Sequence, residues 1–135
     1  MCAVVNVAAE ISGPVSVFKG WSIDYKCIPT RAMTLPTAKQ LVEGVRHIEE
    51  QLEANPGHRV LVHCQDGRTR SAMLILAWYM SRADNEASSP MELVLRIKAQ
   101  RPSVEVAIAK YPVVEEFRKL WIASTPPRIY RRVKR

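Results

Sequence analysis

Cysteines, repeats and long apolar runs are scarce in this sequence of 135 residues, and each shortage excludes a class of protein. The three cysteines are odd in number and irregularly spaced, which argues against a disulfide framework and for an intracellular, reducing compartment. No apolar run approaches the roughly 20 residues that a membrane-spanning helix requires. The first residues carry neither a basic segment nor an arginine-rich presequence, so we expect that a targeting peptide is absent or was removed.

The composition describes one ordinary globular domain with an excess of positive charge. Hydrophobic residues make up 47% of the chain and charged residues 24%. The formal net charge is +7, and the segment 128–135 holds five basic residues and no acidic one. We expect a domain over residues 1–124 and a basic tail over residues 125–135, because Thr125-Pro126-Pro127 stops a helix. Such a tail either attracts an anionic partner or is a solvated terminus.

Apolar periodicity predicts strands that alternate with helices. Short apolar runs predict strands over residues 3–7, 23–28 and 59–63, with Ile23, Tyr25 and Cys27 on one face of the second. Helices are expected from near Pro36 to the stop at Asn55-Pro56-Gly57, over 70–82, from Ser89-Pro90 to Arg101-Pro102, and from Pro112 onward. This order implies an α/β fold with a central, mostly parallel sheet flanked by helices. The core residues of the helices are expected to be Leu41, Val45, Ile48, Leu52, Met73, Leu74, Trp78, Met80, Leu93, Val94, Ile97, Val113, Val114, Phe117, Leu120 and Trp121.

One run of residues carries most of the chemistry, and it lies between the third strand and the helix over 70–82. Cys64 precedes Arg70 by six residues, with Gly67 at the midpoint. A strand that feeds a tight loop at the start of a helix aims backbone N–H groups and the positive end of the helix dipole at one point. A dianionic phosphate fits there. The run reads His63, Cys64, Gln65, Asp66, Gly67, Arg68, Thr69, Arg70 and Ser71.

Each residue type in this loop has a physical role at such a site. The helix dipole and the guanidinium of Arg70 favour the thiolate form of Cys64, so we expect an acidified thiol. Gly67 permits a positive φ, which lets successive amides converge on an anion. The planar fork of Arg70 matches two phosphoryl oxygens. The alternative is a buried structural cysteine beside solvated arginines, and it leaves the spacing of glycine, arginine and serine unexplained.

His63-Cys64, five further residues and Arg70-Ser71 together resemble the phosphate loop of the cysteine-dependent protein tyrosine phosphatase superfamily, in particular its dual-specificity branch. Other landmarks of that branch follow in order at residues 4–10, 28–31 and 99–102. Residues 29–34 look most like the subgroup of mitochondrial phosphatidylglycerophosphate phosphatase and related phospholipid phosphatases. The resemblance covers residues 3–121 and implies a compact dual-specificity-phosphatase fold in the cytoplasm or mitochondria. The strands that usually precede residue 3 are missing, so the chain is either a compact variant or trimmed.

The resemblance also implies the roles of the loop residues. The family hydrolyses phosphate monoesters through a phosphocysteine intermediate formed by Cys64, without a metal or cofactor. Ser71 is expected to ease departure of the thiolate in the second step, and His63 to support the cysteine loop. The residues expected to bind the phosphate, through backbone amides and the guanidinium, are Gln65, Asp66, Gly67, Arg68, Thr69 and Arg70.

The general acid is where this chain departs from the family pattern. Aligned on residues 29–34, the family's aspartate falls at position 32, where this chain has Ala32. Loss of a general acid typically slows a reaction about 10²–10⁴-fold. Three explanations remain open: an Asp-to-Ala variant that traps substrate and turns over slowly, a substitute carboxylate at Asp66 or Asp24, or a phosphate-binding pseudophosphatase.

The charges of the loop indicate which class of substrate the site would take. Arg68 adds a second positive charge, which by resemblance favours an anionic phospholipid such as phosphatidylglycerophosphate or a phosphoinositide. Gln65 and Asp66 differ from the Lys-Ala pair common in that subgroup, and a protein tyrosine or serine/threonine substrate is the alternative. Action on RNA 5′ phosphates ranks last because aromatic and basic residues do not interleave. We expect a monomer that contacts anionic membranes through its tail and has no nucleic-acid partner.

Overall fold

The structure is a computed structural model that describes residues 1–11 and 13–124. The expected basic tail, residues 125–135, lies outside the described residues, and so does Ser12. Over the described ranges, no helix combines the length and the apolar character needed to cross a membrane.

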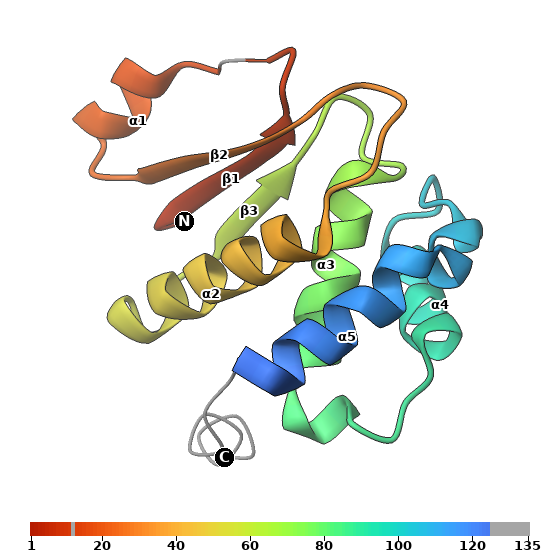
Figure 1. Ribbon diagram of the computed structural model, residues 1–135. Helices are drawn as coiled ribbons and strands as arrows, with labels where there is room; N and C mark the ends of the chain where they lie inside the picture. The colour runs from red at the N-terminus through yellow and green to blue at the C-terminus, as the bar shows by residue number, and fades with distance from the viewer. Residues whose placement is uncertain (12, 125–135) are drawn as a thin grey trace.

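Three parallel strands and the helices that connect them make up the architecture (Figure 1). The sheet order is β2-β1-β3, so β1 is the central strand and pairs in parallel with both neighbours. Parallel neighbours need a crossover connection, and helices supply both. The elements are β1 (Ala3–Ala8), α1 (Val15–Gly20), β2 (Asp24–Thr30), α2 (Ala38–Ala54), β3 (Val60–His63), α3 (Arg70–Ser81), η1 (Ala83–Asn85), α4 (Pro90–Gln100), η2 (Val106–Lys110) and α5 (Pro112–Ser124). The predicted α/β fold with a parallel sheet and flanking helices is confirmed.

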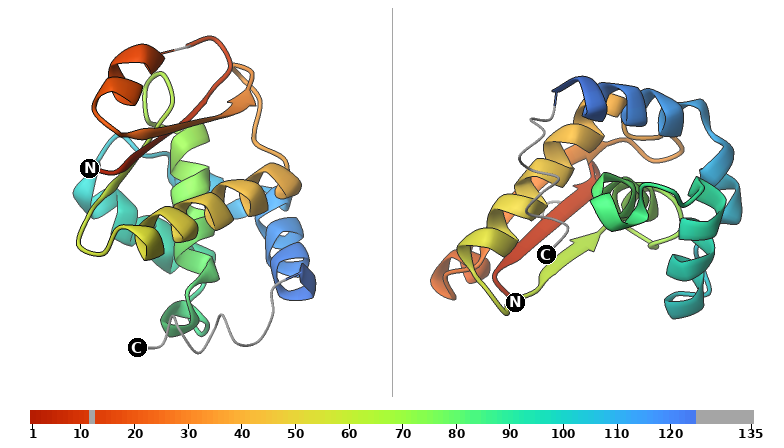
Figure 2. Two further views of the ribbon diagram at one scale, coloured as in Figure 1. Left: turned by 90° about the vertical axis from the view of Figure 1, so that its left-hand side faces the viewer. Right: turned by 90° about the horizontal axis from the view of Figure 1, so that it is seen from below.

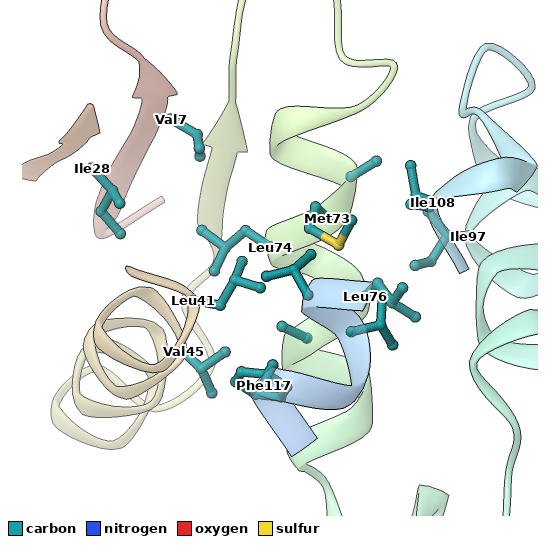
Figure 3. Close-up of a cluster of buried hydrophobic side chains, with 14 of the residues drawn as sticks. Val7, Ile28, Leu41, Val45, Met73, Leu74, Leu76, Ile97, Ile108 and Phe117 are labelled. Carbon is teal, nitrogen blue, oxygen red and sulfur yellow. The ribbon is translucent and has the colours of Figure 1, made fainter. Parts of the chain in front are cut away.

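The hydrophobic core lies between the sheet and a group of helices. Helices α2, α3 and α5 contact one another, and α4 packs against α3 and η2 (Figures 1 and 2). All six residues of β1 are buried, as expected of a parallel strand with neighbours on both sides. Figure 3 shows side chains from the sheet and from the helical elements α2, α3, α4, η2 and α5 meeting in this core: Val7, Ile28, Leu41, Val45, Met73, Leu74, Leu76, Ile97, Ile108 and Phe117.

Side-chain caps fix the first residues of two helices, and one of these caps was predicted. The hydroxyl of Thr37 accepts a hydrogen bond from the Gln40 N–H at 3.1 Å, and the Gln40 side chain returns one from the Thr37 N–H at 2.9 Å. This reciprocal cap starts α2 just after Pro36, close to the predicted start. Ser89 caps α4 and Pro90 is its first residue, as predicted.

Several core predictions were wrong in detail, although the half-exposed second strand is as expected: Phe18 of α1 stacks on Tyr25, and Cys27 is exposed. Leu120 is 37% exposed, because the buried stripe of α5 runs through residues 113, 117 and 121 with Val114 beside it. Leu52, Trp78 and Met80 are only partly buried at the border of the core. Helix α1 was not predicted.

Strand β3 pairs only with β1 among the described residues and is therefore an edge strand of the sheet. An apolar groove of about 570 Å³ follows its open side, lined among others by Val62, Ile75, Trp78 and Ile97. The groove reaches the loop after β3 from the side of Cys64 and Gly67, and Arg70 is not among its lining residues. Gln65, Asp66 and Ser71 line it as well, so the groove meets the same loop that carries Cys64.

Candidate active site

The loop after β3 has the strand–loop–helix geometry that the sequence predicts. β3 ends at His63 and α3 begins at Arg70, so the loop spans residues 64–69 (Figure 1). Cys64 is 6% exposed at the carboxyl end of the parallel sheet, and Gly67 has φ = 71°, the left-handed conformation for which glycine was inferred.

Hydrogen bonds converge on the sulfur of Cys64. Ser71 Oγ lies 3.1 Å from Cys64 Sγ, and the Gly67 N–H donates to the same sulfur at an N···S distance of 3.3 Å. Burial alone would raise the pKa of the thiol. The bonds from the Ser71 hydroxyl and amide and from the Gly67 amide, together with the charge of Arg70, outweigh that effect and hold the pKa of Cys64 below its ordinary value. The thiol is therefore prepared for ionisation.

Arg70 is held in place by Glu10, just after β1, and by Thr30, the last residue of β2. Its Nη1 donates to Glu10 Oε1 at 2.6 Å and to the Thr30 carbonyl at 2.8 Å, and its Nη2 donates to Glu10 Oε2 at 2.6 Å. These contacts use three of the five N–H groups of the guanidinium. The Nε–H and the second Nη2 hydrogen remain available on the other edge of the planar fork, and two phosphoryl oxygens require a fork of that kind.

Glu10 belongs to the candidate site, and no sequence pattern singled it out. It follows the end of β1 and forms a bidentate ion pair with the 6%-exposed Arg70. The hydrogen bonds from the Arg70 guanidinium are the main reason that the pKa of Glu10 is lowered to about 2, and the pKa of Arg70 is raised by the same pairing. Glu10 lies within the family landmark at residues 4–10, but no spacing rule links it to a residue 60 positions away.

Hydrogen bonds connect the outward face of the loop to the segment after α4. Arg101 donates through Nη2 to the Asp66 carbonyl at 3.3 Å and through Nε to the Gly67 carbonyl at 3.4 Å. The Glu105 N–H donates to the Arg68 carbonyl at 3.1 Å. Three successive carbonyls are thus turned outward, and the amides that follow them point toward the inside of the loop. Residues 101–105 therefore set the direction of the loop amides.

The other predicted loop residues differ in their exposure and in their hydrogen-bond partners. The carboxylate of Asp66 accepts a hydrogen bond from the Arg68 N–H at 3.2 Å, so it turns back on the loop as acidic loop residues do. Gln65 and Arg68 are exposed, and Thr69 is half-buried at the start of α3. His63 Nδ1 lies 3.2 Å from the Cys64 carbonyl. No cluster of His, Cys, Asp and Glu in the described part of the chain could hold a metal ion.

Two of the three positions considered for the general acid, Ala32 and Asp24, lie at opposite ends of the sheet. Ala32 is exposed in a turn that begins directly after Thr30, whose carbonyl contacts Arg70. Asp24 pairs with Ala3 at the start of the sheet, where its carboxylate lies 2.6 Å from His47 Nε2. With a rise of about 3.3 Å per residue, Asp24 is on the order of 15 Å from Cys64. The alternative in which Asp24 replaces the missing acid was therefore wrong.

Comparison with known proteins points to one family. Residues 1–114 match the family described as dual specificity phosphatase, catalytic domain. Two proteins of Arabidopsis thaliana, phosphatidylglycerophosphate phosphatase PTPMT1 and phosphatidylglycerophosphate phosphatase PTPMT2, are each 26% identical to this chain over 128 and 117 residues. The matches cover 93% and 86% of this chain but only 36% and 49% of those proteins. The chain thus spans between about one third and one half of the length of these relatives.

Solved structures agree with this result. The crystal structure of Tk-PTP in the active form has a TM-score of 0.72 and 27% identity, and the match covers 87% of this chain and 78% of that one. Human DUSP28 gives a TM-score of 0.69 at 20% identity, covering 93% of this chain and 82% of that one, and shows likeness of fold alone. The chain therefore belongs to the family of dual-specificity phosphatase catalytic domains, which are cysteine-based phosphatases.

Proposed function

We propose that this domain hydrolyses phosphate monoesters through a phosphocysteine intermediate formed on Cys64. The observation that carries the proposal is the convergence of Ser71 Oγ and the Gly67 N–H on the Cys64 sulfur, at 3.1 and 3.3 Å, beside an Arg70 fork with two hydrogens still available. A thiolate in that position faces a phosphorus atom whose oxygens are held by the guanidinium and the loop amides.

The reaction has two displacements. In the first, the thiolate of Cys64 forms the S–P bond while the P–O bond to the leaving alcohol breaks, and the alkoxide takes up a proton. In the second, water attacks phosphorus, the S–P bond breaks, and inorganic phosphate leaves as the thiolate is restored. The hydroxyl of Ser71 stabilises the departing thiolate because it already lies 3.1 Å from the sulfur.

Ala32 makes the first displacement slow, because this side chain supplies no proton to the alkoxide. Asp66 is a poor substitute, since its carboxylate is engaged by the Arg68 N–H at 3.2 Å within the loop. We therefore propose that the domain binds its substrate well and turns it over slowly. This behaviour lies between that of a full enzyme and that of a phosphate-binding pseudophosphatase.

We propose an anionic phospholipid as the substrate class. The support comes from the phosphatidylglycerophosphate phosphatases among the relatives and from the exposed arginines Arg31 and Arg68 on both sides of the site. The formal net charge of +7 favours an anionic surface as well. We propose a monomer in a reducing compartment, the cytoplasm or mitochondria, with a domain over residues 1–124, a membrane-contacting tail over 125–135 and no nucleic-acid partner.

The test is phosphate release from phosphatidylglycerophosphate, phosphoinositides and phosphopeptides, measured for the chain and for its Ala32→Asp and Cys64→Ser variants. We expect the lipids to be preferred and Ala32→Asp to raise kcat on an aryl phosphate by at least about tenfold, the lower part of what a general acid supplies, with little change in KM. Cys64→Ser should abolish turnover on every substrate. A preference for phosphopeptides would replace the lipid assignment, and turnover by Cys64→Ser would refute the mechanism.

A further inference from the structure

Met33 is the most exposed large apolar side chain among the described residues. It is 100% exposed, whereas the next, Trp21, is 70% exposed. Its backbone has φ = 67°, in the left-handed region that a non-glycine residue rarely adopts. A side chain held outward in this way gains nothing from the core of its own domain.

The turn that carries Met33 is fixed by its own hydrogen bonds. The Thr34 N–H and the Thr34 hydroxyl both donate to the Arg31 carbonyl, at 3.1 and 2.6 Å. The turn closes over residues 31–34, and Met33 projects from it while its backbone is held. The exposure of Met33 is thus built into the local structure.

This turn belongs to the rim of the active site. It starts directly after Thr30, whose carbonyl accepts a hydrogen bond from Arg70 at 2.8 Å. In Figure 1 the segment between β2 and α2 and the loop between β3 and α3 lie at the same end of the sheet. We define the rim as residues 31–34 and 65–68. A partner or membrane surface that docks on this end of the sheet would therefore contact Met33.

The charges of the rim indicate what kind of surface it would bind. Arg31 and Arg68 are exposed cations of the rim. Its one acidic residue, Asp66, directs Oδ1 to a loop amide, and Glu10 behind it is engaged by Arg70. One apolar tip between exposed arginines suits the interface of an anionic bilayer, where the methionine reaches the acyl chains and the arginines meet the head groups.

We propose that Met33 enters the acyl region of an anionic membrane and holds the rim on its surface, so that a lipid phosphate reaches Cys64 without leaving the bilayer. The proposal rests on the phospholipid assignment above and adds the element that docks. A single inserted side chain gives weak, reversible binding, which suits an enzyme that must move from one lipid to the next.

The decisive experiment is sedimentation of the full chain with sucrose-loaded vesicles of phosphatidylcholine containing phosphatidylglycerol. Met33→Gln keeps the length of the side chain and adds no carboxylate beside Ala32, and Met33→Leu keeps the apolar character. Leu95→Gln is the matched control, because Leu95 is 52% exposed on α4, outside the rim. We expect Met33→Gln to lower the vesicle partition coefficient about tenfold, from the burial of one methionine side chain, and the other two variants to leave it within about twofold.

Activity assays separate this proposal from the one on which it rests. On a soluble aryl phosphate, Met33→Gln should match the parent chain, whereas on phosphatidylglycerophosphate in vesicles it should be slower by the same factor as the loss of partitioning. Unchanged partitioning of Met33→Gln, or an equal loss in Leu95→Gln, would overturn the role of Met33 even if the lipid is hydrolysed. Partitioning that depends on Met33 without hydrolysis of any lipid would sustain the membrane contact and refute the phospholipid substrate.

Discussion

The ion pair between Glu10 and Arg70 offers the sharpest test of how this site is built. Glu10→Ala removes two of the three contacts of the guanidinium and leaves only the Thr30 carbonyl, at 2.8 Å. The fork can then rotate away from the position in which its open edge faces the sulfur. Because misplacement of a positioning group by about 1 Å costs on the order of 10²-fold, we expect kcat/KM on an aryl phosphate to fall about 100-fold.

Glu10→Gln should lie between the parent and Glu10→Ala. It retains one acceptor oxygen for Arg70 and turns an amide NH₂ against the other donor, which opposes the bidentate geometry. The matched control is Glu43→Gln, which breaks an exposed pair with Lys26 at 3.4 Å and should leave kcat/KM unchanged.

Both variants of Glu10 remove a negative charge from the neighbourhood of the sulfur, which lowers the pKa of Cys64, and also loosen Arg70, whose charge helps to hold that pKa down. The pH dependence of iodoacetate alkylation measures that pKa independently of turnover. A kcat/KM that is unchanged or higher in Glu10→Ala, with the fold intact by circular dichroism, would refute the view that Glu10 positions the arginine.

Three further predictions concern the loop and its ionisation. Gly67→Ala should lower both kcat and Tm, because φ is 71° there and the added methyl would lie 2.5 Å from Arg101 Nη2. Unchanged kcat and Tm would contradict the inference that Arg101 and the conformation of Gly67 shape the loop. Ser71→Ala should shift the alkylation midpoint of Cys64 to higher pH and slow hydrolysis of the phosphocysteine in single-turnover assays, since the 3.1 Å contact to the sulfur is lost. The pKa of Glu10 lies below its ordinary value, so its ion pair should be fully present above about pH 4.5 and be lost as pH falls through about 2; a carboxyl titration by NMR with a midpoint near 4.5 would disprove this.

The contiguous part of the site could be predicted from the sequence, because its chemistry is local. Cys64, Gly67 and Ser71 lie within eight residues of one another on a strand–loop–helix unit, and the structure brings them into contact as inferred. The same holds for Ser89, whose residue type marked the start of α4. Local rules suffice wherever partners are close in the chain.

The rest of the site depends on which elements become neighbours, and periodicity does not contain that information. Glu10 and Arg101 meet the loop across 60 and 34 residues, through the pairing of β1 with β3 and the packing of α4 on α3. Helix α1 escaped prediction because it has only six residues and buries none of them, so it leaves no apolar stripe.

The position of β3 at the edge of the sheet affects how mutations in the sheet would change activity and folding. Its ladder to β1 consists of four paired positions, from Ala3 with Val60 to Asn6 with His63. That single ladder determines the height of Cys64 relative to Glu10 at the far end of β1, since a shift of one residue would displace the sulfur by about 3.3 Å and reverse the faces of the strand. Changes at Val5 or Val62 that disturb this ladder should therefore lower activity under conditions in which far-ultraviolet spectra still report a folded protein.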